Sequence, residues 1–117
     1  MTDKKKQLYS EYISEAIKYM EKNIRKSLTF EDVLMNVRLG ETYLKKIFKE
    51  KTGLSVMHYF KNMKIDEAKK LIDNTNMSFT QISSYLGYDS IHYFSRQFKT
   101  ITGLSPTQYR QKGRIDK

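Results

Sequence analysis

The chain has 117 residues and no Cys, and its 22 Lys and Arg against 13 Asp and Glu give a net charge of +9. This charge favours a polyanionic partner, either nucleic acid or an acidic surface, while the lack of Cys excludes a disulfide framework and a thiolate metal site. No apolar run has the length of a signal peptide or a membrane span, so we expect a soluble protein of the reducing cytoplasm.

The first predicted helix covers residues 8–26. Apolar side chains recur there every three or four residues, which places them on one stripe of an amphipathic helix. A second, shorter helix ends near Val37, with Thr29 as its N-cap and two acidic residues in its first turn, where they suit the helix dipole. The stripe of the first helix consists of Tyr12, Ile13, Ala16, Ile17, Met20 and Ile24.

A turn at residues 38–40 leads to a third helix over about 42–52. Helical spacing separates its apolar side chains, which we expect to be buried, from a polar outer face. Gly53 can adopt the left-handed conformation that closes a helix. The buried face is predicted to consist of Tyr43, Leu44, Ile47 and Phe48, and the outer face of Thr42, Lys45, Lys46 and Lys49.

The longest predicted helix follows, over residues 55–75. It contains neither Gly nor Pro, and at 1.5 Å per residue it is roughly 30 Å long. We interpret it as a rigid spacer between two lobes. Beyond it, Ser78 is a good N-cap for a short fifth helix that ends near Leu86.

A second turn, at residues 87–89, leads to a sixth helix over about 90–102, which Gly103 ends. Pro106 then opens a seventh helix, at the first helical position, where its missing N–H costs nothing. On the sixth helix the buried face is predicted to consist of Tyr93, Phe94, Phe98 and Ile101, and the outer face of His92, Ser95, Arg96 and Lys99.

The two halves of the chain repeat one sequence. Each half has the order of a short helix, a turn, a second helix and a Gly stop, which is that of a helix-turn-helix, and two copies are too few for a solenoid. The identical pairs include Tyr43 and Tyr93, Phe48 and Phe98, Lys49 and Lys99, Thr52 and Thr102, Gly53 and Gly103, and Tyr59 and Tyr109. We therefore predict an all-α, seven-helix fold with a first helix-turn-helix lobe at 8–54, a linker helix at 55–75, a second lobe at 76–112, and flexible tails at 1–7 and 113–117.

The outer faces of the third and sixth helices indicate DNA binding. An α-helix fits the major groove of B-DNA, where Arg or Lys reaches guanine acceptors and short polar side chains position or discriminate. If the spacer holds both helices on one side of the duplex, they would reach successive major grooves about 34 Å apart. The predicted site is asymmetric, and its DNA-binding residues are Thr42, Lys45, Lys46, Lys49, His92, Ser95, Arg96 and Lys99.

Other interpretations of the same faces stay open. They could be ordinary solvated charge, a module that grips an acidic partner protein, or a non-specific architectural DNA binder, although the last would need only charge and not the mixed His, Ser and Thr. His92 could also be a metal ligand, but His58 is the only other His. Because no catalytic constellation or Gly-rich phosphate loop is identified, we predict no enzyme, no cofactor and no metal site.

The runs from Tyr88 to Lys99 and from Thr102 to Arg110 closely resemble the signature of AraC/XylS-type transcription regulators. The resemblance covers residues from about 8 to 111. It implies a seven-helix DNA-binding domain that regulates bacterial transcription through contact with RNA polymerase. The chain is also similar to the C-terminal domain of YesN-type response regulators. The base-reading positions implied by the resemblance are Thr42, Lys45, Lys46, His92, Ser95 and Arg96.

Two residues of the first lobe depart from the family pattern. Leu34 stands where a small residue, matching Ser83, is usual, and Arg38 stands where the turn Gly, matching Gly87, is usual. A non-Gly residue at positive φ costs on the order of 1 kcal/mol, and Gly40 is a candidate to relocate that strain. Family members often carry an N-terminal sensor, dimerisation or receiver domain, so the chain is either a stand-alone regulator or a fragment of a longer protein.

Overall fold

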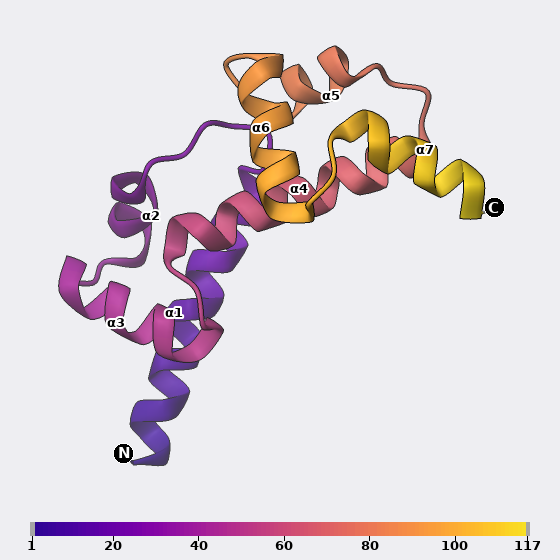
Figure 1. Cartoon of the computed structure of the whole chain (residues 1–117). Helices are drawn as coiled ribbons and strands as arrows, with labels where there is room; N and C mark the ends of the chain where they lie inside the picture. The colour runs from indigo at the N-terminus through magenta and orange to yellow at the C-terminus, as the bar shows by residue number, and fades with distance from the viewer. Residues whose placement is uncertain (1, 117) are drawn as a thin grey trace. The chain divides into compact units, whose positions relative to one another are not determined.

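The structure, a computed structural model, describes the backbone of residues 2–116 and the side chains of residues 2–113. Within this range the chain forms seven helices and no strand, so the predicted all-α fold is confirmed (Figure 1). Met1 and Lys117, which belong to the tails predicted as flexible, lie outside the described residues. The helices are α1 (Asp3–Lys22), α2 (Phe30–Val37), α3 (Glu41–Thr52), α4 (Val56–Asn74), α5 (Phe79–Tyr85), α6 (Ile91–Thr102) and α7 (Pro106–Asp116).

The helices fall into two compact units. Unit 1 extends to Ile24 and continues over Leu28–Phe60, whereas unit 2 comprises Arg25–Ser27 and the chain from Lys61 onward. The boundary therefore lies inside α4, whose first turn belongs to unit 1 and whose remainder belongs to unit 2. The finer division into lobes at 8–54 and 76–112, with a separate linker, stays a prediction.

Side-chain caps fix where α2, α5 and α6 begin. Thr29 Oγ1 accepts a hydrogen bond from the Asp32 amide (3.2 Å), and the Asp32 carboxylate accepts one from the Thr29 amide (2.9 Å). Ser78 forms the same reciprocal capping box at α5, and Ser90 caps α6. Each cap satisfies helix N–H groups that would otherwise lack a partner, at about 1 kcal/mol. The predicted N-caps Thr29 and Ser78 are confirmed.

The bounds predicted for the first helix were wrong. α1 begins at Asp3 rather than at residue 8, because Thr2 Oγ1 accepts a hydrogen bond from the Lys5 amide (3.3 Å) and starts the helix upstream of the apolar stripe. It ends at Lys22 rather than at residue 26. At this end the Asn23 side chain donates to the Tyr19 carbonyl (2.8 Å). The polar first turns carry no periodicity, so the sequence pattern could not locate them.

The repeat extends to the long helix that covers each core. Unit 1 buries three apolar side chains of α1, and unit 2 buries three apolar side chains of α4 with the same spacing and a small residue in the middle. The small central Ala lets the helix pack closely on the others. The two sets are Ile13, Ala16 and Met20 of α1, and Ile65, Ala68 and Ile72 of α4.

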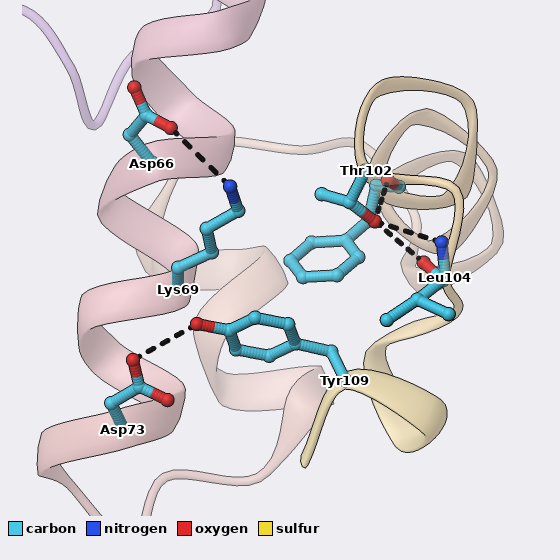
Figure 2. Close-up of polar contacts among 7 residues, drawn as sticks. Asp66, Lys69, Asp73, Thr102, Leu104 and Tyr109 are labelled. Carbon is cyan, nitrogen blue, oxygen red and sulfur yellow. Dashed lines mark hydrogen bonds and ion pairs between the residues drawn. The ribbon is translucent and has the colours of Figure 1, made fainter. Parts of the chain in front are cut away.

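The Thr-Gly-Leu stretch ends α3 and α6 in the same way. The hydroxyl of Thr102 donates to the Phe98 carbonyl (2.8 Å) and accepts from the Leu104 amide (3.0 Å) (Figure 2). Thr52 makes the corresponding bonds at the end of α3. The glycine that follows each Thr adopts a left-handed φ of 80° or 83°, which confirms the predicted helix stops.

In each unit an aromatic pair packs the helix that ends at this stretch against the helix that follows it. The rings of Phe98 and Tyr109 meet edge to face with centroids 5.5 Å apart, and Phe48 and Tyr59 repeat the contact at 5.4 Å. Such pairs contribute about 0.5–1.5 kcal/mol beyond their area. In unit 2 the Tyr109 hydroxyl also donates to Asp73 of α4 (3.0 Å) (Figure 2).

The turn between α2 and α3 carries the strain that its sequence predicted. Arg38 lies in the left-handed region, with φ 58° and ψ 39°, and it is the one non-Gly residue at positive φ among the described residues. Gly40 has φ −66° and ψ 149° and serves as the N-cap of α3. The proposed role of Gly40 in relocating the strain was therefore wrong, because Arg38 itself adopts the conformation.

Candidate nucleic-acid interface

The outer face of α3 is exposed and mostly cationic. Thr42, Lys45, Lys46 and Lys49 are all exposed, as the helical spacing predicted. Lys45 is the most constrained of the four, because its ammonium group pairs with Glu41 one turn earlier (2.9 Å) and lies 5.1 Å from the centre of the Phe30 ring. Both partners of the ion pair are more than half exposed, so it orients Lys45 and adds little stability.

The outer face of α6 carries its predicted residues with one difference in exposure. His92, Arg96 and Lys99 are exposed, whereas Ser95 is half-buried. Within the described part of the chain neither Arg96 nor Lys99 forms an ion pair with an acidic side chain, so both charges are available to an anion. The structure thus gathers each predicted quartet on one helix face, the first in unit 1 and the second in unit 2.

Other basic residues of unit 2 have structural roles. The guanidinium of Arg110 donates to the Met77 carbonyl (3.1 Å) and lies over the Phe79 ring (4.2 Å). That of Arg25 lies over the Tyr85 ring at 3.9 Å. Cation–π contacts of this kind stabilise the packing of the Arg side chain. Net charge alone would have counted both residues as possible DNA contacts.

Tyr43 and Tyr93 are more exposed than predicted. Both were expected in the buried faces, but Tyr43 is 39% exposed and Tyr93 is 47% exposed. The rings lie at the edge of the apolar stripe, where an amphipathic side chain can pack its ring and leave its hydroxyl in water. Ile101, also expected to be buried, is half-buried. The sequence signal that marks the edge is the position of each Tyr immediately before the buried Leu44 or Phe94.

Each exposed Tyr is held by a neighbouring side chain. A hydrogen bond with Tyr9 raises the pKa of Tyr43 to about 12, and the two rings meet edge to face at 5.5 Å. In unit 2 the Gln97 amide nitrogen donates to the Tyr93 oxygen (3.3 Å). The Tyr43 hydroxyl therefore stays protonated at neutral pH, and both rings have restricted orientations.

A buried lysine supports the turn that leads into α6. Lys64 of α4 is 5% exposed, and its ammonium group donates to the Leu86 carbonyl and lies 5.2 Å from the centre of the Tyr88 ring. Burial lowers the pKa of Lys64 to about 8 and raises that of Tyr88. The Tyr88 hydroxyl donates in turn to the Gln97 side chain of α6. Sequence reasoning missed this support, because a lysine at helical spacing normally predicts a solvated position.

The comparisons with known proteins agree with this fold. A family model described as a helix-turn-helix domain matches residues 35–112. The arabinose operon regulatory protein of Escherichia coli is 31% identical over 99 residues, which are 84% of this chain and 34% of that protein. The chain spans between 31% and 36% of the length of several such curated relatives.

Solved structures show the same arrangement of helices. The C-terminal domain of AraT, a response regulator from Geobacillus stearothermophilus, matches with a TM-score of 0.81 and 31% identity over 86% of this chain and 84% of that one. The DNA-binding domain of the global transcriptional factor AdpA, solved with a target DNA, has the same fold with a TM-score of 0.83 and 16% identity, over 90% of this chain and 95% of that one.

These observations define a double helix-turn-helix domain. The chain belongs to the helix-turn-helix family of AraC/XylS-type transcription regulators, as its sequence signature implied. Within the described residues no helix combines the length and the apolar character that a bilayer span requires.

Proposed function

We propose that the chain binds double-stranded DNA sequence-specifically and thereby regulates bacterial transcription. The observation that carries the proposal is that α3 and α6 occupy equivalent positions in two helix-turn-helix units and present an exposed polar and basic face each. Membership of a family of DNA-binding regulators supports it, as does the likeness in fold to a domain solved with its target DNA. That family is one of regulators rather than of enzymes.

Affinity and specificity come from different contacts. Lys and Arg contacts to phosphates supply an affinity that falls steeply with salt, because each releases bound counterions. Base preference comes from side chains at the centre of the two outer faces, at roughly 1–3 kcal/mol for each good bidentate contact. The proposed DNA-binding residues are Thr42, Lys45, Lys46 and Lys49 of α3, and His92, Ser95, Arg96 and Lys99 of α6.

Arg96 is the strongest candidate to read a base. Its planar guanidinium can donate two hydrogen bonds to the O6 and N7 of one guanine, which a lysine cannot match in geometry. Ser95 is half-buried, so it is placed to contact a base or phosphate only at close approach. On α3 the corresponding pair is Lys46 and Lys45, and the ion pair of Lys45 with Glu41 directs that side chain toward the start of the helix.

The two recognition helices are proposed to enter successive major grooves of one duplex. The helix α4 is continuous from Val56 to Asn74 and contains no Gly or Pro. A continuous helix is a stiff connection, and successive major grooves on one side of DNA are about 34 Å apart. Because the two faces carry different residues, the bound site would be asymmetric.

The remaining partners follow from the family. We propose contact with RNA polymerase, and in a longer protein a sensor or receiver domain on the amino side, as expected for a response regulator. A regulator of bacterial transcription acts on the chromosome, so its location would be the cytoplasm.

The test is selection of binding sites from a random pool of duplex DNA with the purified chain, followed by a salt titration of the enriched site. The proposal expects an asymmetric motif whose affinity falls steeply with salt. Steep salt dependence without enrichment would indicate a non-specific binder instead. Indifference to DNA together with tight binding to an acidic protein would replace the proposal with a protein-interaction module.

A further inference from the structure

We propose that the hydroxyl of Tyr93 is an oriented hydrogen-bond donor for a DNA phosphate at the flank of α6. The inference rests on the proposed function, because it assigns a contact within the same interface. Tyr93 was predicted to be a core residue, yet 47% of its surface is exposed. An amphipathic Tyr at the edge of the apolar stripe packs its ring and leaves its hydroxyl in water, where the hydroxyl can meet an external hydrogen-bond acceptor.

The position of Tyr93 on the helix suits a phosphate rather than a base. With 3.6 residues per turn, Tyr93 lies about 60° around the helix axis from Arg96, at the edge of the outer face. A helix in the major groove has base edges ahead of it and a sugar-phosphate backbone along each flank. Thr100, on the same flank within about 20° of Tyr93, adds no charge there.

Hydrogen bonding fixes the direction in which Tyr93 can donate. The Tyr88 hydroxyl donates to the Gln97 carbonyl oxygen, and the Gln97 amide nitrogen donates to the Tyr93 oxygen (3.3 Å). Tyr93 is therefore the last acceptor in this series of hydrogen bonds. Among the described residues its own proton has no acceptor, so it is available to an external one.

Packing holds Tyr88, the residue at which this series of hydrogen bonds begins. Tyr88 is half-buried, its ring packs against those of Tyr93 (5.8 Å) and Phe94 (5.2 Å), and the Lys64 ammonium group lies beneath it. A donor that is already oriented loses less entropy on binding than a free side chain does. Gln97 is thus a positioning residue, which acts on DNA only through Tyr93.

The repeat supplies an internal comparison. Tyr43 occupies the same position on α3, is 39% exposed and is held by Tyr9. However, Glu50 stands where unit 2 has Thr100, and its negative charge acts on the Tyr43 hydroxyl. A carboxylate beside the donor opposes an approaching phosphate, so the proposal concerns Tyr93 and predicts a smaller effect at Tyr43.

The experiment compares the wild-type chain with Tyr93→Phe on its selected duplex, across a salt series. We expect roughly tenfold weaker binding, the size of one hydrogen bond to a charged group. The salt slope should not change, because a neutral donor releases no counterion, whereas Lys99→Ala should reduce the slope by about 0.9. Tyr85→Phe is the matched control, since Tyr85 is an exposed Tyr of unit 2 outside α6.

A second measurement locates the phosphate by comparing the wild type with Tyr93→Phe. Single neutral methylphosphonates are placed along both strands, and the position that weakens wild-type binding but not Tyr93→Phe binding identifies the acceptor. Gln97→Leu should reproduce part of the loss at that same position. Circular dichroism melts confirm that each variant is folded.

The outcomes separate this inference from the proposed function. If the wild type fails to select any duplex, the proposed function fails and the inference fails with it. If the wild type selects a site that Tyr93→Phe binds equally well, the function stands and the Tyr93 contact is excluded. A changed base preference in Tyr93→Phe would also overturn the inference, because it would make Tyr93 a base reader.

Discussion

The turns of the two helix-turn-helix units have a left-handed residue at the same position, but they differ in the residue that occupies it and in the space around it. In unit 1 the residue is Arg38, with φ 58°, and in unit 2 it is Gly87, with φ 76°. A Cβ on Gly87 would lie 2.5 Å from the Arg25 carbonyl oxygen, closer than real Cβ atoms approach. Glycine in unit 2 is thus required by space as well as by φ, whereas unit 1 tolerates a long side chain with exposed surroundings.

The difference teaches that a repeat preserves backbone geometry more strictly than side-chain chemistry. Unit 2 packs the Arg25–Ser27 segment against its turn, and the Lys64 ammonium group donates a hydrogen bond to the Leu86 carbonyl of the same turn. In the same unit Ser83 is buried and donates to the Ser90 carbonyl (3.3 Å). Unit 1 has the half-buried Leu34 at the position of Ser83. Its turn therefore has fewer close constraints than that of unit 2.

The largest expected effect comes from adding a methyl group to the crowded turn. Gly87→Ala should destabilise the chain by about 3 kcal/mol, from the left-handed strain and the contact with the Arg25 backbone together. Gly103→Ala is the control, because Gly103 has φ 83° with open space around it, and it should cost only about 1 kcal/mol. Urea unfolding measures both. Equal losses of stability in the two variants would contradict the claim that the Arg25 backbone leaves no space for a side chain at position 87.

A smaller effect is expected from the buried lysine of unit 2. Lys64→Met keeps the side-chain volume but removes the donor to the Leu86 carbonyl, which should lower stability by roughly 1–2 kcal/mol at pH 7. Chemical denaturation detects this loss. No change in the midpoint would mean that the Leu86 carbonyl does not depend on the ammonium group.

The same variant tests the titration of Lys64. Its pKa is lowered to about 8 in the folded chain, from 10.5 for an ordinary lysine. Over that interval the unfolded chain binds more protons than the folded one, so the free energy of unfolding rises with pH. The stability of the wild type minus that of Lys64→Met should therefore grow between pH 8 and 10.5. The raised pKa values of Tyr88 and Tyr109 act the other way above pH 10 in both proteins.

The smallest effect is a gain in unit 1. Arg38→Gly should stabilise the chain by about 0.5–1 kcal/mol, because glycine adopts positive φ without the Cβ penalty. Thermal or urea unfolding would show a modest upward shift. A loss of stability would instead mean that the Arg38 side chain makes contacts whose worth exceeds the strain.

Much of this fold could be predicted from the sequence because its signals are local. Gly53 and Gly103 end helices through their own φ, and Thr29 and Ser78 cap helices through atoms three residues away. The outer-face residues of α3 and α6 followed from helical spacing alone. Their roles in DNA binding stay predictions.

What the sequence could not predict depends on contacts between distant residues. The buried Lys64 meets a carbonyl 22 residues later, and the steric need for Gly87 comes from Arg25, 62 residues earlier. The exposure of Tyr43 and Tyr93 was missed for a different reason. Hydrophobicity assigned the rings to the core, whereas the hydroxyl and the edge position decide where a tyrosine lies.

The central claim is that each unit reads its own part of one DNA site. The most direct measurement is parallel selection of sites with the wild type, Lys46→Ala and Arg96→Ala. The wild type should give two base blocks about one helical turn apart, and each variant should lose a different block while keeping the other. A single block in the wild type, or the loss of the same block in both variants, would contradict the claim that both recognition helices read bases.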